Sequence, residues 1–430
     1  MSASAVRSVS EAVAGGDTLE IGKTKAVVRR MAWVSGLIGT ILTFSFSNYL
    51  SLITFGNAEF SVAFRWLSIT LLFTQLSNSQ LVVLQGFRKL ALLAKANVFG
   101  NALGLICSLP MYFFLGKDGI VGSLLISSSL SLLVALYYGR KESIVPGQLT
   151  MEQFSKKAKH ILGMGIALSF SNILVLLGAY FFKIYIGSKG GISDVGLYSA
   201  GYAIVNTYVG MIFTAMATDF YPRLSGTKEE QSFNSIVNHQ GEIAILIVGP
   251  LLIGMIVFIK YLILLLFSSE FLQIIEMIKW CLLGILFKAV SWPIGFIILA
   301  KGESKVFFLS ELVANINMLV LGCIGYYFFS LEGIGISYLI GYFLLAIQIS
   351  IIVKNRYNFR YNYSMIRIFI VMFLMLVLVL VVPKFIPAPA DFVVSLMILA
   401  ISISVSLRLI NNRFSFIDLI TSKIFSNRRK

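Results

Sequence analysis

The sequence is poor in charge. Asp, Glu, Lys and Arg make up only 13% of its 430 residues, whereas 58% are hydrophobic. An ordinary soluble domain has about 25% charged residues, so the composition excludes a water-soluble globular protein. A helix needs about 20 apolar residues to cross a bilayer, and such runs follow one another along most of the chain. The composition therefore predicts an all-α integral membrane protein.

Residues that hold metals or form disulfides are also scarce. The three cysteines, Cys107, Cys281 and Cys323, fall far apart inside apolar runs, and the two histidines, His160 and His239, lie in polar connectors. These spacings match neither a disulfide framework nor a zinc motif. We therefore expect no metal site and no cofactor.

Catalytic motifs are missing from the sequence as well. It contains no Gly-rich loop ending in Gly-Lys-Ser/Thr, no nucleophile elbow and no paired His-Glu helix motif. The connectors on one side are short throughout, which leaves no room for a folded catalytic domain there. The sequence thus predicts no catalytic residues and no enzyme, and it favours transport.

Apolar runs and helix breakers predict twelve transmembrane helices. They lie at about 31–55, 61–87, 91–116, 119–139, 161–187, 197–222, 243–267, 272–300, 305–330, 333–353, 366–385 and 392–410. The predicted organisation is a cytoplasmic N-terminal segment (1–30), a four-helix N-terminal lobe (31–139), a basic cytoplasmic linker (140–160), a six-helix C-terminal lobe (161–353), an extra helix pair (366–410) and a basic cytoplasmic tail (411–430).

Basic residues alternate in density from one connector to the next. The chain has 35 Lys and Arg against 19 Asp and Glu, and most of the basic residues fall in every second connector and near the two termini. The other connectors hold only Arg65, Lys117, Lys189 and Lys384. Because Lys and Arg concentrate in cytoplasmic loops, we expect both termini in the cytoplasm. The positive charge then indicates contact with anionic lipid, not with nucleic acid.

An internal repeat joins the two halves of the chain. The stretch QGFRKLALLAKANVFGN from Gln85 parallels KGESKVFFLSELVANIN from Lys301, and a gap of about two residues matches Gly86 to Gly302 and Asn101 to Asn315. Both copies begin on the same side of the membrane. A parallel repeat of this kind predicts two pseudo-symmetric lobes around a central cavity.

Lysines inside the apolar runs are the main candidates for a binding site. A charge at the bilayer centre costs about 3 kcal/mol or more, so such residues usually serve a function. Lys288 lies mid-span and is a candidate cation for a substrate phosphate; the alternative is a cation that only stabilises helix packing. Lys260 and Lys183 are weaker candidates because their long stems can reach the interface.

A second hypothesis concerns opposite charges in the two lobes. Lys95 and Glu311 lie early in spans three and nine, near the cytoplasmic face. Paired, they would form a gate, and Lys95 is also a candidate substrate-binding residue. The alternative is that each stabilises only its own helix packing.

Two stretches carry a family resemblance. VGLYSAGYAIVNTYVGMIFTAMATDFYPRLS (195–225) and VVLQGFRKLALLAKANVFGNALGL (82–105) resemble the bacterial polysaccharide flippases, the O-antigen and capsule exporters of the multidrug/oligosaccharidyl-lipid/polysaccharide exporter superfamily. The resemblance implies a flippase of the bacterial cytoplasmic membrane that moves undecaprenyl-diphosphate-linked oligosaccharides by alternating access. It also implies contact with membrane lipids and, as further partners, a polysaccharide polymerase and a chain-length regulator.

The sequence differs from the family in one feature, and three other classes of membrane protein remain as alternatives to a flippase. The segment SASAVRSVSEAVAGGD resembles the loop after the second helix of the family, so the first hairpin lacks a counterpart. Either the chain is a shortened variant or Met1 is an internal methionine of a longer gene, and we expect the latter. A drug/cation antiporter of the same superfamily would carry intramembrane carboxylates. A membrane glycan enzyme would carry a large basic outer loop, and a scaffold would have no central cavity.

Overall fold

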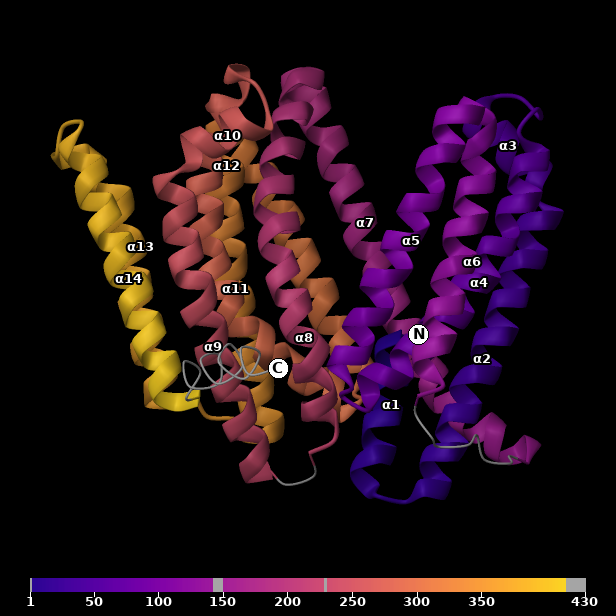
Figure 1. Cartoon of the computed structure of the whole chain (residues 1–430). Helices are drawn as coiled ribbons and strands as arrows, with labels where there is room; N and C mark the ends of the chain where they lie inside the picture. The colour runs from indigo at the N-terminus through magenta and orange to yellow at the C-terminus, as the bar shows by residue number, and fades with distance from the viewer. Residues whose placement is uncertain (1, 142–149, 228–229, 415–430) are drawn as a thin grey trace, which may run out of the picture. The chain divides into compact units, whose positions relative to one another are not determined.

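The computed structural model describes residues 2–141, 150–227 and 230–414, and all regular structure in these residues is helical (Figure 1). Nine helical segments of this part of the chain are long and apolar enough to cross a membrane. Three of them, Leu90–Gly139, Met151–Ser225 and Ser304–Tyr357, each contain a backbone break between two membrane-length helices. The twelve predicted spans are therefore confirmed, and the protein is an all-α integral membrane protein.

Contacts divide the chain into two units. The first unit comprises Met1–Ser169 and Thr218–Thr227, and the second comprises Phe170–Ala217 and Lys228–Lys430. The predicted lobes were separated by a linker over 140–160, whereas the contacts change unit inside helix α7 and again inside helix α8. Two continuous helices are thus shared between the units.

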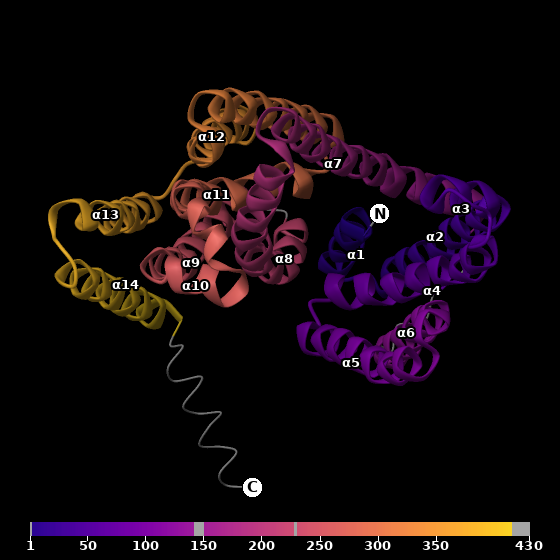
Figure 2. The ribbon, with the colours of Figure 1, turned by 90° about the horizontal axis from the view of Figure 1, so that it is seen from above.

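The first unit begins with a helix that hydropathy does not predict. It contains α1 (Ser2–Gly15), α2 (Thr18–Ser45), α3 (Ser47–Phe55), α4 (Ser61–Gly86), α5 (Leu90–Leu115), α6 (Gly119–Gly139) and the first part of α7 (Met151–Tyr202). The expected N-terminal segment is therefore helical, and it buries Val6 and Val9 of α1 and Val27 of α2. Helix α4 packs against α1, α2 and α6, and α5 pairs with α6 (Figure 2).

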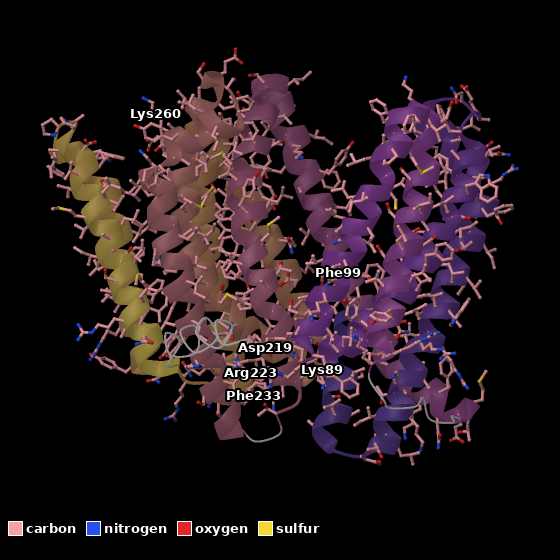
Figure 3. All side chains as sticks on the ribbon, viewed as in Figure 1. Lys89, Phe99, Asp219, Arg223, Phe233 and Lys260 are labelled. Atoms are coloured by element: carbon pink, nitrogen blue, oxygen red, sulfur yellow. The ribbon has the colours of Figure 1, made fainter. Side chains whose placement is uncertain are left out.

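The end of α8 (Val209–Ser225) packs within the first unit. The Arg88 side chain donates to Asp219 Oδ1 from both Nε and Nη2, at 3.0 and 2.9 Å. Gln85 Nε2 donates to the carbonyl oxygen of Thr218 at 3.3 Å. Figure 3 shows Asp219 and Lys89 at the same end of this unit. These contacts explain why Thr218–Thr227 groups with the first unit and not with the rest of α8.

The second unit holds the larger apolar core. It contains the remainder of α7, a π-helical turn (Ala203–Tyr208), most of α8, α9 (Glu230–Val257), α10 (Ile259–Leu266), α11 (Ile275–Lys301), α12 (Ser304–Tyr357), α13 (Tyr363–Phe385) and α14 (Ala390–Phe414). Ile245, Leu252, Ile278 and Leu286 are fully buried between α9 and α11 and their neighbours. The predicted extra pair corresponds to α13 and α14, which pack on α9 (Figure 2). Residues 142–149 of the predicted linker and 415–430 of the predicted tail lie outside the described residues.

The internal repeat is visible in the backbone of the two units. Between α4 and α5 the chain turns through Arg88 (φ 57°), and between α11 and α12 it turns through Gly302 (φ 75°). The next turns pass through Gly116 (φ 55°, ψ −128°) and Ser330 (φ 50°, ψ −136°). The spacing along the chain is the same for both pairs and equals that from Asn101 to Asn315. The repeat is therefore continuous here, and the expected two-residue gap is wrong.

Two close contacts between helices lie at positions that the repeat makes equivalent. A Cβ added at Gly119 would lie 2.4 Å from the carbonyl oxygen of Met111, and one added at Gly333 would lie 1.9 Å from that of Gly325. Only glycine allows the helices after these turns to approach so closely. Both contacts agree with the spacing set by the turns, so the two hairpins are copies of one structure.

The corrected register changes which residues correspond. Lys288 now matches Thr74, and Glu311 matches Asn97, whereas Lys95 matches Leu309. Lys95 and Glu311 therefore do not occupy equivalent positions, contrary to the expectation from the gapped alignment. The error arose because Gly86 was matched to Gly302, although Arg88 is the residue with positive φ in the first unit.

Candidate functional site

The second unit contains a cavity of about 260 Å³ at membrane depth. Its lining comes from α7, the π-helical turn, α11 and α12. Polar or aromatic-hydroxyl side chains in the lining are Tyr198, Tyr202, Asn206, Glu311, Asn315, Ser337, Tyr338 and Tyr342. We refer to it as the second-unit cavity.

Lys288 adjoins this cavity through an aromatic ring. Its Nζ lies 5.3 Å from the ring centroid of Tyr342 and 5.5 Å from that of Phe213. Aromatic faces attract a cation, and more strongly where water is scarce. Lys288 is half-buried in the middle of α11, so the rings hold a positive charge within the membrane.

Glu311 supplies a negative charge to the same region. Glu311 lines the cavity, and Lys288 is the charged residue that acts on its carboxyl group. One turn along α12, Asn315 Nδ2 donates to the Glu311 carbonyl oxygen at 2.7 Å. The region of the second-unit cavity therefore contains one acidic and one basic side chain.

Tyrosines and an unusual helical turn also line the second-unit cavity. Tyr338 Oη donates to Asn206 Oδ1 at 2.9 Å, and the Tyr338 and Tyr342 rings lie 4.7 Å apart. Asn206 lies in the π-helical turn, a feature that often marks functional sites. Its buried Nδ2 has no hydrogen-bond partner among the described residues. This donor is available to a ligand in the cavity.

The first unit contains a corresponding cavity of about 220 Å³ between α4, α5 and α6. Its polar lining residues are Thr74, Ser77, Asn78, Asn97, Asn101, Ser128 and Ser131. In the corrected register Asn97, Asn101 and Ser128 correspond to Glu311, Asn315 and Tyr342 of the second-unit cavity. The two cavities therefore share these repeat positions, although α7 and the π-helical turn also line the second-unit cavity; an acidic residue lines the second-unit cavity and neutral residues line the first. We refer to this one as the first-unit cavity.

The other predicted site residues lie apart from these cavities. Lys260 is exposed on α10, at the end of the second unit opposite Phe233 (Figure 3). Lys183 is exposed on α7, and Lys95 is exposed on α5. None of the three lines the two cavities. Of the predicted site residues, Glu311 lines the second-unit cavity and Lys288 lies beside it.

Sequence reasoning missed the neutral members of both cavities. Three helices each carry a pair of polar residues that lie four residues apart, on one helix face. The pairs are Thr74 and Asn78 on α4, Asn97 and Asn101 on α5, and Glu311 and Asn315 on α12. Amides and hydroxyls repeated at this spacing inside apolar runs were the available signal. The search for ionisable residues did not detect it.

The second-unit cavity and Lys288, which lies beside it but does not line it, together offer groups that can bind an anionic, polyhydroxylated ligand. The Lys288 ammonium can bind a phosphate as a point charge. Tyrosine rings offer an apolar surface with a polar tip, and Asn206 offers a free donor.

Comparison with known proteins places the chain in a family. The polysaccharide biosynthesis protein family matches residues 23–276. The Shigella flexneri "Putative O-antigen transporter" is 24% identical over 262 residues, which cover 60% of this chain and 62% of that protein, less than two thirds of its length. The "Lipid III flippase" of Escherichia coli strain K12 is 19% identical over 302 residues, 70% of this chain and 71% of that protein.

Solved structures show the same fold. An outward-facing multidrug resistance transporter of the MATE family in the MOP superfamily has a TM-score of 0.73 at 14% identity, with 83% of both chains covered. A MOP superfamily transporter from Pyrococcus furiosus has a TM-score of 0.66 at 17% identity, covering 83% of this chain and 84% of that one. The resemblance inferred from the sequence is confirmed, and the chain belongs to the polysaccharide biosynthesis protein family, with the fold of the MOP superfamily transporters.

Proposed function

We propose that this protein flips a polyprenyl-diphosphate-linked oligosaccharide across the bacterial cytoplasmic membrane, for the synthesis of O-antigen, capsule or exopolysaccharide. The observation that carries the proposal is Lys288, a cation held within the membrane beside the tyrosine-lined second-unit cavity. A lipid diphosphate joined to a sugar combines the two chemistries that this site can bind. The names of the two relatives agree with this substrate class.

The proposal includes a direction and an orientation. The substrate enters from the cytoplasmic leaflet and leaves on the periplasmic side, with both termini in the cytoplasm, as the basic connectors predict. Membrane lipids surround the helices, and a polysaccharide polymerase and a chain-length regulator act on the delivered product. Lys95, Lys183 and Lys260 belong to this proposal only as weaker substrate contacts, because each lies exposed outside the two cavities.

A drug/cation antiporter is the second candidate, and Glu311 favours it. A carboxylate at membrane depth is what a cation antiporter needs. Lys288, however, lies beside the same cavity, so an organic cation entering the cavity would meet an ammonium as well as a carboxylate. The flippase therefore fits the electrostatics better.

The experiment is deletion of the gene in its own bacterium, followed by analysis of lipid-linked oligosaccharides. We expect loss of surface polysaccharide and accumulation of the lipid-linked unit in a form that externally added glycosidase cannot reach. Expression of the intact gene should reverse both effects. A strain lacking the polymerase serves as the control, because its lipid-linked unit should accumulate in a form that the glycosidase does reach.

The opposite result would favour the antiporter. If deletion leaves surface polysaccharide unchanged but makes cells more sensitive to ethidium, the flippase proposal is wrong. Ethidium efflux that depends on Glu311 would then assign the cavity to a cation.

A further inference from the structure

The Ser131 side chain of the first-unit cavity makes no hydrogen bond to another described residue, and neither do four others in this cavity: Thr74, Asn78, Asn97 and Asn101. These four lie near the middle of α4 and α5. By contrast, Asn315 in the second-unit cavity is bonded to its own helix. The first unit therefore presents free amide and hydroxyl groups at membrane depth.

These groups face a polar space and not lipid. Thr74, Asn97 and Asn101 are exposed, and an unsatisfied polar group in hydrocarbon costs several kcal/mol. The cavity of about 220 Å³ far exceeds the roughly 10–15 Å³ that one water molecule needs. It is large enough for an organic group together with water.

The charge of the lining decides which group fits. Among the described residues, the lining of this cavity contains no carboxylate, no lysine and no arginine, so these residues offer no counter-charge to a metal cation or to a phosphate. An asparagine side chain supplies two donors and one acceptor, and a hydroxyl supplies one donor and accepts. This set of groups complements the hydroxyls and acetamido group of a sugar.

We propose that the first-unit cavity is a subsite for an uncharged sugar of the transported molecule, bound by Asn97, Asn101 and Thr74. The inference rests on the proposed function, because it names a part of the same substrate. It assigns the recognition of an uncharged sugar to the neutral copy of the repeated cavity.

Binding to the purified full-length protein in lipid nanodiscs tests the proposal. The two probes are farnesyl diphosphate and the same lipid diphosphate carrying one N-acetylglucosamine, with quenching of tryptophan fluorescence as the readout. We expect the sugar-bearing probe to bind the unchanged protein more tightly. The double variant Asn97→Leu/Asn101→Leu should raise its Kd about tenfold, as expected for the loss of two hydrogen bonds, and leave the Kd of farnesyl diphosphate unchanged.

Matched variants separate this effect from general damage. Thr74→Val should weaken the sugar-bearing probe, whereas Thr70→Val, one turn away on α4, should have no effect because the Thr70 hydroxyl already donates to the Leu67 carbonyl. Lys288→Ala should weaken both probes. Asn97→Gln/Asn101→Gln should restore part of the affinity for the sugar-bearing probe.

The outcomes distinguish the two proposals. If Lys288→Ala weakens both probes but the Asn97/Asn101 variant changes neither, or changes both equally, the sugar subsite is wrong and the flippase proposal stands. If the unchanged protein binds neither probe, both proposals are overturned. The Kd of each probe is also compared between NaCl and choline chloride. If Asn97→Leu/Asn101→Leu abolishes a difference in Kd between these salts but keeps the preference for the sugar-bearing probe, the cavity is a cation site and the subsite is wrong.

Discussion

The two units build the same hairpin around different chemistry. In the first unit the cavity residues at the repeat positions are Asn97, Asn101 and Ser128, and in the second they are Glu311, Asn315 and Tyr342. The turns and close helix contacts have remained matched, whereas the lining has diverged. The comparison teaches that the backbone fixes where a polar cavity lies, and the lining decides what it binds.

The largest difference between the two units is Lys288, which has the neutral Thr74 as its counterpart in the first unit. Replacing Lys288 by threonine, its counterpart Thr74, should lower export of surface polysaccharide about tenfold or more, because a charge-assisted contact to phosphate is lost. Export is measured on cells with equal amounts of each protein in the membrane. Lys288→Arg should retain most of the export.

The control for this variant is Lys384→Thr at an exposed lysine of α13, which should export normally. Normal export by Lys288→Thr as well would mean that the charge difference between the units has no role in transport.

The shared helix contact offers a test of the common backbone. Gly333→Ala should reduce the free energy of unfolding by about 2 kcal/mol, because the new Cβ meets the Gly325 carbonyl oxygen. Gly119→Ala should cost less because its Cβ would have more room. Thermal unfolding of the purified protein measures both. Gly210→Ala, where nothing lies within 4 Å of the added carbon, is the control, and an equal loss there would contradict the contact.

The two opposite charges of the second unit should be energetically coupled. Lys288→Thr and Glu311→Asn each give the second unit the residue of the first, and each alone leaves the other charge unbalanced in the membrane. The double variant should therefore be more stable than the sum of the single effects implies, by about 1 kcal/mol. A double-mutant cycle of unfolding free energies measures the coupling. Additive effects would show that Lys288 and Glu311 act independently.

The smallest expected effect concerns the turn between the halves of each hairpin. Ser330 adopts the positive φ that Gly116 has in the first unit. Ser330→Gly should stabilise the protein by about 0.5–1 kcal/mol, since glycine tolerates this conformation without strain, and Gly116→Ser should destabilise it. Ser330→Ala keeps a Cβ and should not stabilise the protein; a gain there equal to that of glycine would rule out strain as the cause.

Several features were predictable because their signals are local in the sequence. The apolar runs predicted twelve spans, and Lys288 was detectable because a lysine in an apolar run is rare. The repeat was detectable from Asn101 and Asn315. Its register was not, because both Arg88 and Gly302 adopt positive φ, and the letters alone favoured matching the glycines.

Other features had no comparable signal. Helix α1 is too polar for hydropathy to detect, although it buries Val6 and Val9. The π-helical turn at Asn206 follows from no residue pattern that we recognise. The first-unit cavity escaped notice because amides and hydroxyls are common enough in membrane helices that none is conspicuous alone.

The sequence by itself determined that this is a polytopic helical membrane protein with an internal repeat, because the transfer of apolar residues into lipid adds up along each run. Tertiary structure decided which polar side chains share a cavity. Thr74, Asn97 and Ser128 lie on three helices, and only the packing of those helices brings their side chains to one space. The same packing sets Lys288 against Tyr342, and so separates a charged cavity from a neutral one.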